Sequence, residues 1–258
     1  MKQNFQIHYK NEDDEVISFP YESFKVDENY EYLPSSKLIR FWSWLSYKFI
    51  ATPFIFIYIK LIKRVKFVNK RVLKNFKKGG YFVYANHTNQ FCDAFSPSLI
   101  CFPKKPHIIV DSANISIPFW GKLTKIWGAI PTPNTIGASK NFSKTIEEIL
   151  SKNNPIIIYP EAHLWPYYTK IRNFNSTSFR FPIKYNKPIF TFTTTYHKRK
   201  FGKSPKIIIY IDGPFTINSS LEEKESQKNL HTQIHNKLQE RSKLSNYEFI
   251  NYIRSDDD

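Results

Sequence analysis

The segment YFVYANHTNQFCD, residues 81–93, joins an apolar and aromatic run to a histidine and a carboxylate. Residues 81–85 have the β-branched and aromatic content of a buried strand, and two glycines precede them. A polar cluster begins at Asn86, so His87 follows the carboxyl end of this predicted strand. Ligands of open α/β sheets gather at the carboxyl ends of strands. The pattern therefore predicts an α/β fold in which His87 faces a crevice.

A second apolar run, residues 156–158, ends on a similar cluster, Tyr-Pro-Glu-Ala-His at residues 159–163. If both runs are strands of one sheet, we expect the two clusters to meet at the same edge. His87 can then act as a general base, with Asp93 orienting its ring. A histidine near an aspartate is also common as a satisfied polar pair, and this alternative stays open.

The two clusters resemble the motifs of the glycerolipid acyltransferase family, which includes 1-acylglycerol-3-phosphate and other lysophospholipid acyltransferases. That family carries Asn-His, four residues and Asp, and later a Phe-Pro-Glu-Gly-Thr block at a strand end. Here Asn86-His87 is followed by five residues and Asp93, and Ala162 and His163 stand in place of the glycine and threonine. The resemblance implies one α/β domain with a central mixed sheet flanked by helices.

The resemblance also implies His87 and Asp93 as the catalytic pair and Glu161 as a residue that contacts the acceptor or holds its own loop. Lys170 and Arg172 follow the second cluster, and we expect them to neutralise a headgroup phosphate, with a solvated surface as the alternative. Backbone N–H groups of the two turns are the expected oxyanion donors. The residues expected to bind substrate are Asn86, Glu161, Ala162, His163, Lys170 and Arg172.

The sequence predicts no cofactor and no metal. Its seven glycines form no Gly-rich phosphate loop, it has no Gly-x-Ser-x-Gly elbow, and its two cysteines lack ligand spacing. Acyl transfer from a thioester to a hydroxyl needs only a base, oxyanion stabilisation and exclusion of water. The expected donor is acyl-CoA or an acyl thioester of acyl carrier protein, and the sequence does not choose between them.

The formal net charge of +16 is unevenly distributed. Residues 1–36 hold three lysines and eight acidic residues, whereas the rest of the chain holds 35 basic and 14 acidic residues. Such an excess suits an anionic surface, either acidic lipid headgroups or nucleic acid. We expect a membrane partner and no nucleic-acid partner.

Residues 41–62 are rich in apolar and aromatic side chains, and Lys37 and the basic stretch from Lys63 flank them. Pro53 is expected to split this run into two short helices, with Thr52 as the N-cap of the second. A helical hairpin lying in the membrane interface fits this pattern; a hairpin inside the core and a single membrane span are the alternatives. The domain division expected is an acidic arm (1–36), a membrane-binding hairpin (37–72), an acyltransferase domain (73–215) and a polar helix with a tail (216–258).

The sequence thus predicts an acyltransferase bound peripherally or monotopically to the cytoplasmic face of the cell membrane. It is expected to acylate a lysophospholipid, with 1-acylglycerol-3-phosphate as the leading acceptor. The alternatives are another hydroxyl acceptor lipid, a hydrolase of the same fold, and a non-catalytic basic protein that binds membranes or nucleic acid.

Overall fold

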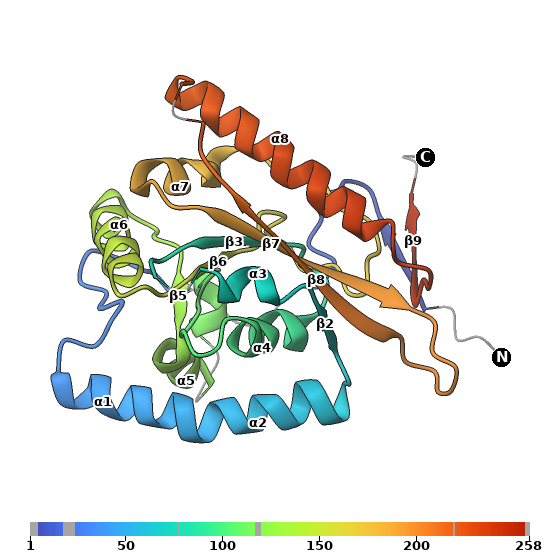
Figure 1. Ribbon diagram of the computed structural model, residues 1–258, viewed down its shortest axis with the longest axis horizontal. Helices are drawn as coiled ribbons and strands as arrows, with labels where there is room; N and C mark the ends of the chain where they lie inside the picture. Colours follow the sequence, from blue (N-terminus) through green and yellow to red (C-terminus); the bar gives the residue numbers. More distant parts are fainter. Residues whose placement is uncertain (1–4, 18–23, 77, 117–119, 219, 256–258) are drawn as a thin grey trace.

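A seven-stranded sheet lies at the centre of the computed structural model, which describes residues 5–17, 24–76, 78–116, 120–218 and 220–255 (Figure 1). The strand order is β2-β8-β7-β3-β6-β4-β5, and all neighbours are parallel except β7 and β8. The expected central mixed sheet flanked by helices is therefore confirmed. The strands are β2 (Lys66–Val68), β3 (Phe82–Ala85), β4 (His107–Val110), β5 (Ala129–Pro131), β6 (Ile156–Ile158), β7 (Ile189–His197) and β8 (Lys206–Phe215).

Helices cover both faces of this sheet. Side chains of a strand alternate between faces, so β3 presents Val83 to one layer and Phe82 and Tyr84 to the other. The N-terminal apolar helix, α3 and α4 pack with Val83, whereas α6 and α8 pack on the opposite face. The α-helices are α1 (Lys37–Ser46), α2 (Thr52–Phe56), α3 (Arg71–Lys74), α4 (Gln90–Ile100), α5 (Trp120–Trp127), α6 (Ile136–Ser151), α7 (Arg180–Tyr185) and α8 (Glu223–Ser242).

The two apolar runs of the motifs form the neighbouring strands β3 and β6. They pair in parallel, with Tyr84 opposite Ile158. Both strands are fully buried. Their carboxyl ends therefore deliver His87 and the 159–163 cluster to one edge of the sheet, as expected.

The predicted helical hairpin is wrong, because Lys37–Ile62 forms one continuous 26-residue helix along one side of the molecule (Figure 1). Pro53 does not split it. A π-helical segment, Tyr47–Ala51, precedes the proline, and the Thr52 hydroxyl donates to the Tyr47 carbonyl at 2.8 Å. Wider turns of this kind accommodate a residue that lacks an N–H. The helix is long and apolar enough to cross a membrane, judged by length and composition only.

The buried stripe of this helix repeats every four residues. Four residues exceed one α-helical turn, so such a stripe would drift by about 40° at each step along an ideal helix. Two π-helical segments, Tyr47–Ala51 and Ile57–Ile62, widen the turns and keep the stripe facing the sheet. The stripe consists of Ser43, Tyr47, Ala51, Ile55 and Ile59.

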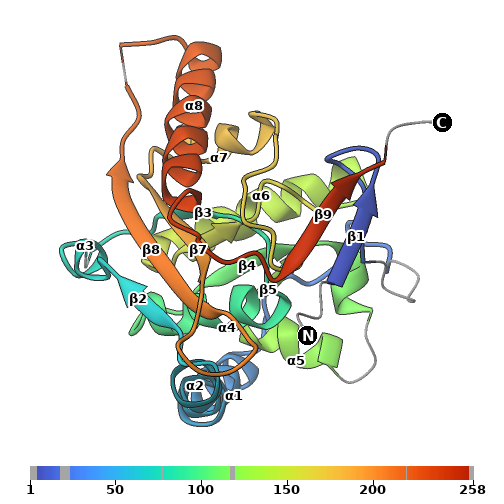
Figure 2. The same ribbon diagram turned by 90° about the vertical axis from the view of Figure 1, so that its right-hand side faces the viewer.

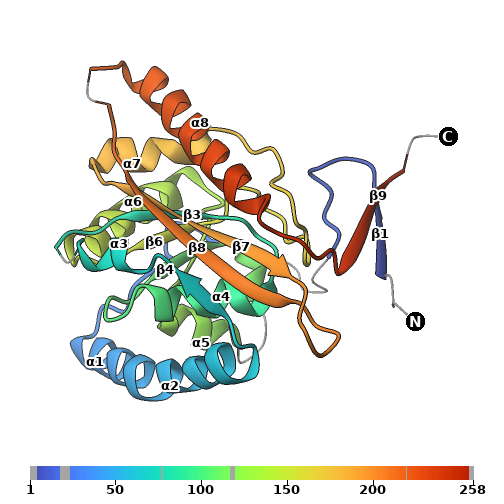
Figure 3. The ribbon, with the colours of Figure 1, turned by 45° about the vertical axis from the view of Figure 1, so that its right-hand side comes forward.

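The two ends of the chain form a small parallel sheet of their own. Strand β1 (Phe5–Tyr9) pairs with β9 (Ile250–Arg254), and Figures 2 and 3 show this pair standing beside the main sheet. The expected acidic arm thus begins with a short strand. The segment after residue 215 is not a separate tail, because Leu230, Ile234 and Leu238 of α8 are buried in the core.

His107 is a buried histidine that should make the fold sensitive to acid. Burial, with nearby Lys105, lowers the pKa of His107 to about 3, against 6.5 for an exposed ring. As the pH falls, His107 binds a proton in the unfolded chain at a higher pH than in the folded chain. Stability is therefore lost progressively as the pH falls from 6.5 towards 3. We expect the free energy of unfolding to drop by about 1 kcal/mol between pH 7.5 and 5.5 through this group alone.

Denaturant unfolding of His107→Leu at these two pH values should show that part of the pH dependence removed. The matched control, His8→Leu, changes an exposed ring and should keep the wild-type dependence. An unchanged pH dependence in His107→Leu would contradict the assignment.

Candidate active site

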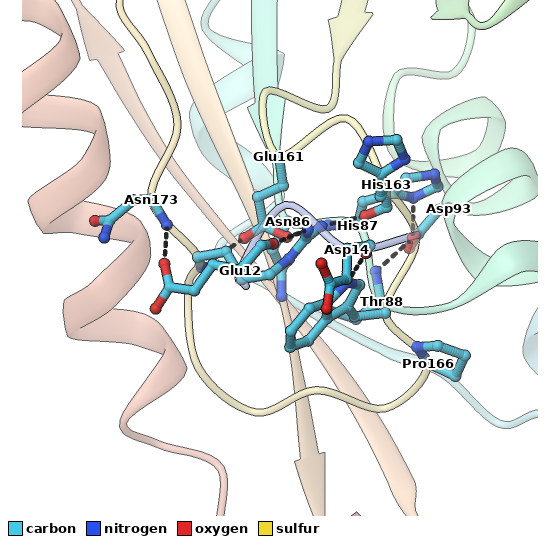
Figure 4. A network of polar contacts seen from close by, with 12 residues as sticks. Glu12, Asp14, Asn86, His87, Thr88, Asp93, Glu161, His163, Pro166 and Asn173 are labelled. Carbon is cyan, nitrogen blue, oxygen red and sulfur yellow. Dashed lines mark hydrogen bonds and ion pairs between the residues drawn. The ribbon is translucent and has the colours of Figure 1, made fainter. Parts of the chain in front are cut away.

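His87 and Asp93 form a hydrogen-bonded pair at the carboxyl edge of the sheet (Figure 4). The Nδ1 atom of His87 lies 2.9 Å from Oδ2 of Asp93. The same oxygen accepts hydrogen bonds from the backbone N–H groups of Thr88 and Asn89, each at 2.9 Å. A carboxylate held this way accepts a hydrogen bond from the Nδ1–H group of His87, which leaves the Nε2 lone pair available as a base. The His87 side chain is 24% exposed, so substrate can reach it.

The extra residue between His87 and Asp93 is absorbed where helix α4 begins. Asn89 is the N-cap, and its side chain accepts from the Cys92 N–H at 3.1 Å. Asp93 therefore lies in the first turn of α4, and its carboxylate folds back onto His87.

Tyr159 supports the pair and was not singled out from the sequence. Its ring stacks on the His87 imidazole at 4.6 Å, with 28° between the planes. Its hydroxyl donates to the Asp93 carbonyl at 2.6 Å, and burial raises the pKa of Tyr159 well above 10. A tyrosine that stays protonated in this way holds both the ring and the first turn of α4.

Glu161 and Arg172 form a buried ion pair beneath residues 86–89, which the motif predicts to be catalytic and which are called the catalytic turn below. Both residues are almost inaccessible, and Nη2 of Arg172 lies 3.4 Å from Oε2 of Glu161. The same oxygen accepts the His87 N–H at 3.3 Å. Burial raises the pKa of Glu161, and the neighbouring guanidinium offsets part of this shift. Of the two expected roles of Glu161, the geometry matches holding the loop.

Arg172 does not reach solvent, contrary to the phosphate-binding role expected for it. Its guanidinium donates to the carbonyls of His163 and Glu12 and lies 4.8 Å from the Trp165 ring. Burial lowers the pKa of Arg172, and the neighbouring Glu161 carboxylate opposes this shift. The sequence does not reveal this burial, because it depends on the N-terminal arm folding over the loop.

Asn86 also points into the protein, although substrate binding was expected. Its side-chain amide donates to the Thr194 carbonyl at 3.0 Å and accepts the Thr194 N–H at 2.8 Å. Both polar atoms are thus used to join the end of β3 to Thr194 within β7. Asn86 fixes where the chain turns towards His87.

The remaining expected residues, Ala162, His163 and Lys170, lie nearer the surface. Ala162 and Lys170 are exposed and His163 is half-buried. Ala162 has a φ of +62°, a left-handed conformation that suits glycine, which explains the glycine of the related motif at this place. Figure 4 shows His163 on the side of the cluster where His87 meets Asp93.

The oxyanion donors expected in the two turns are largely committed within the protein. The N–H groups of Thr88 and Asn89 donate to Asp93. Those of Ala162 and His163 donate to the Tyr159 and Glu161 carbonyls, at 3.2 and 2.8 Å. The first N–H groups of α4, which lack intrahelical partners, are the nearest alternative in sequence.

The loop after Glu161 is fastened to the catalytic turn by its backbone. The Trp165 N–H donates to the His87 carbonyl at 3.1 Å, and the Tyr167 N–H donates to the Thr88 carbonyl at 2.8 Å. From the other side the arm reaches the loop, since the Trp165 indole donates to the Asp14 carbonyl at 2.8 Å (Figure 4). These contacts of Trp165 and of the arm were not foreseen, because nothing local in the sequence signals them.

The described residues at this edge of the sheet include neither a reactive thiol nor a cluster of metal ligands. Cys92 is fully buried and its pKa is raised to about 12, mainly by desolvation. Among the described residues no group of three or more His, Cys, Asp or Glu side chains could hold a metal ion. The site therefore offers a histidine base without a covalent nucleophile beside it.

A histidine whose ring is held by a carboxylate at the carboxyl edge of an α/β sheet is an arrangement that can remove a proton from a hydroxyl group. The chain belongs to the acyltransferase family, whose model, described as Acyltransferase, matches residues 64–195, just over half of the sequence. It is an O-acyltransferase by this membership. No curated protein was found to match it.

Among solved structures, the chain is similar to the crystal structure of the 1-acyl-sn-glycerophosphate (LPA) acyltransferase, PlsC, from Thermotoga maritima. The identity is 16% and the TM-score 0.48, and the match covers 79% of this chain and 97% of that one.

The buried pair of Glu161 and Arg172 should be strongly coupled. Replacing either residue with glutamine leaves the other charge buried without its partner, so each single variant should lose about 3 to 5 kcal/mol of unfolding free energy. The double variant Glu161→Gln/Arg172→Gln should lose less than the sum. Denaturant unfolding of the four proteins measures this coupling.

The surface pair of Lys237 and Glu240 provides the control cycle, since its side chains are partly exposed. Its coupling should stay below about 1 kcal/mol. If the losses of unfolding free energy in the two single variants add up to that of the double variant, Glu161 and Arg172 do not stabilise each other.

Proposed function

We propose that this O-acyltransferase moves a fatty acyl group from an acyl thioester to the hydroxyl of a lysophospholipid at a membrane surface. The observation that carries the proposal is the His87–Asp93 pair, with Nε2 of His87 free of described partners and the side chain partly exposed. By its motifs the leading acceptor is 1-acylglycerol-3-phosphate. The donor is acyl-CoA or acyl carrier protein thioester, and both belong in the assay.

In the proposed mechanism His87 removes the proton from the acceptor hydroxyl as the oxygen attacks the thioester carbonyl. Asp93 stabilises the imidazolium that forms and keeps Nδ1 protonated. The tetrahedral intermediate then collapses, the carbon–sulfur bond breaks, and the imidazolium returns its proton to the departing thiolate. Products are the diacyl lipid and the free thiol, and His87 is again neutral.

The acceptor phosphate needs a cationic partner outside the buried pair. Lys170 is exposed, and His163 is half-buried and lies beside the His87–Asp93 pair in Figure 4. We therefore take these two residues as the candidates for binding the phosphate. Arg172 acts on them indirectly in this proposal, because it holds the His163 carbonyl and hence the loop.

Membrane association follows in this proposal from the outer face of the Lys37–Ile62 helix. Its inner stripe belongs to the core of the domain, so the helix cannot leave the sheet to cross a bilayer without exposing that core. An interfacial position suits a helix with one apolar outer face and one face bound to protein. Its exposed large apolar residues are Leu38, Ile39, Phe41, Trp42, Trp44, Phe49, Ile50, Phe54, Phe56, Ile57, Leu61 and Ile62.

The cytoplasmic face of the cell membrane fits the chemistry of the chain. Cys92 and Cys101 are free, buried thiols, as in proteins of reducing compartments. A peripheral or monotopic enzyme on that face would meet both thioester donors.

The first test of the reaction is transfer of a labelled acyl chain from both donors to a panel of lysophospholipids. His87→Ala should lower the rate by at least about a hundredfold, because a positioned base contributes that much or more. Asp93→Asn should also lower kcat strongly, because an amide cannot accept from Nδ1–H in the same way. Circular dichroism should show both variants folded.

Product analysis separates transfer from hydrolysis, the alternative reaction of this fold. A diacyl product that disappears in His87→Ala supports the proposal. Free fatty acid without diacyl product would indicate a hydrolase, and full activity in His87→Ala would remove this residue from the mechanism.

The helix assignment predicts that four outward aromatic residues hold the enzyme on vesicles. The variant with Trp42, Trp44, Phe49 and Phe54 changed to serine should lose on the order of 5 kcal/mol of binding, because each buries apolar area in the interface. Flotation with lipid vesicles measures this. Ile136→Ser/Leu244→Ser, which removes exposed apolar residues elsewhere, should bind as the wild type does.

A further inference from the structure

The loop that joins β7 and β8, residues 198–205, concentrates positive charge around one exposed aromatic ring. Its sequence is KRKFGKSP, and Lys206 follows it as the first residue of β8. Phe201 is 80% exposed, and the side chains of Lys198, Lys200 and Lys203 are also exposed. The loop contains no acidic residue to neutralise them. The Nζ atom of Lys200 lies 5.7 Å from the centre of the Phe201 ring, so an aromatic ring and a cation project together from this loop.

The loop is fastened to the end of the apolar helix. Nη2 of Arg199 donates to the Lys63 carbonyl at 2.9 Å, at the C-terminal end of that helix, and its Nε donates to the Pro205 carbonyl at 3.2 Å. On the other side the Lys198 N–H donates to the Asn246 side chain at 3.1 Å. These bonds set where Phe201 projects.

The loop continues the surface that the helix presents. Figures 1 and 3 show the β7–β8 turn beside the end of the Lys37–Ile62 helix, on the same side of the molecule. Leu61 and Ile62 end the apolar face, with 59% and 63% of their surfaces exposed. The helix end and the loop, which the bond from Arg199 to the Lys63 carbonyl joins, are both rich in basic residues: Lys63, Arg64, Lys66, Lys198, Lys200 and Lys203.

We propose that residues 198–205, together with the basic end of the helix, form a second contact with an anionic membrane. Phe201 enters the boundary between headgroups and acyl chains, and the lysines bind lipid phosphates. An aromatic ring beside basic residues is the combination that anionic interfaces favour. The proposal rests on the membrane position of the helix in the proposed function.

A second contact has a geometric consequence for the enzyme. A single helix lying in the interface leaves the domain free to roll about the helix axis. The β7–β8 loop extends from the main sheet beside that axis, so binding through Phe201 fixes the roll. The membrane then holds the sheet edge with His87 at one orientation.

The test compares two variants that lose the same charge at different places. Lys198→Gln/Lys200→Gln/Lys203→Gln changes the loop, and Lys140→Gln/Lys144→Gln/Lys184→Gln changes exposed or partly exposed lysines of α6 and α7 on the opposite face of the sheet. Binding is measured by flotation with phosphatidylcholine vesicles, with and without phosphatidylglycerol, over a range of salt concentrations.

The loop variant should bind anionic vesicles about a hundredfold more weakly, with a shallower salt dependence, because each of the three lysines near the surface contributes about a factor of five. The control variant should stay within about twofold of the wild type. Equal losses in both variants would overturn the proposal, because they would indicate long-range attraction without a local contact.

A label on the loop provides a readout that does not depend on affinity. Ser204→Cys places a thiol beside Phe201 for an environment-sensitive fluorophore, and the native Cys92 and Cys101 are buried and unreactive. Phosphatidylglycerol vesicles should shift the emission to shorter wavelength, and Phe201→Ser should abolish the shift. No shift with bound vesicles, or a response only to an oligonucleotide, would overturn the proposal.

These measurements need no substrate. If the wild type showed no acyl transfer, the proposed reaction would be contradicted. The comparison of the loop and control variants would still test the second membrane contact.

Discussion

The buried pair of Glu161 and Arg172 ties together segments that are far apart in the sequence. Glu161 receives the His87 N–H, and Arg172 binds the carbonyls of His163 and Glu12. One ion pair thus connects the end of β6, the catalytic turn, the loop after Glu161 and the N-terminal arm. Charges buried in this way are stable only while their partners stay in place. The site is therefore held by electrostatics as much as by the strands that deliver it.

The parts of the site that the sequence predicted are those with a local signal. Strands β3 and β6 follow from short apolar runs bounded by polar residues, and His87 and Asp93 lie six residues apart on one turn. Here the chain needs no distant contact to bring the groups together. The resemblance of the motifs also pointed to the acyltransferase family, which the family match confirms.

The parts of the structure that could not be predicted depend on contacts between distant segments, or are exceptions to a local sequence preference. Arg172 looks like a surface cation until the arm and Trp165 cover it. Pro53 normally begins or breaks a helix, but a π-helical turn absorbs it, and the expected hairpin becomes one helix. Tyr159 could have been suspected, because it directly follows β6 at the edge of the sheet where His87 was expected.

The pairing of β1 with β9 sets an order on the assembly of the enzyme. Phe5 lies opposite Ile250, so these strands are joined by nearly the whole chain, and contacts of that separation close late in folding. Tyr252 of β9 stacks on Trp165 at 5.0 Å, and Trp165 in turn binds the His87 carbonyl. On the ribosome β9 emerges after the rest of the domain. The turn that carries His87 thus receives its outer support only after β3 and β6, the strands that deliver the two motifs, have been made, so a domain without β9 would lack part of the packing around its site.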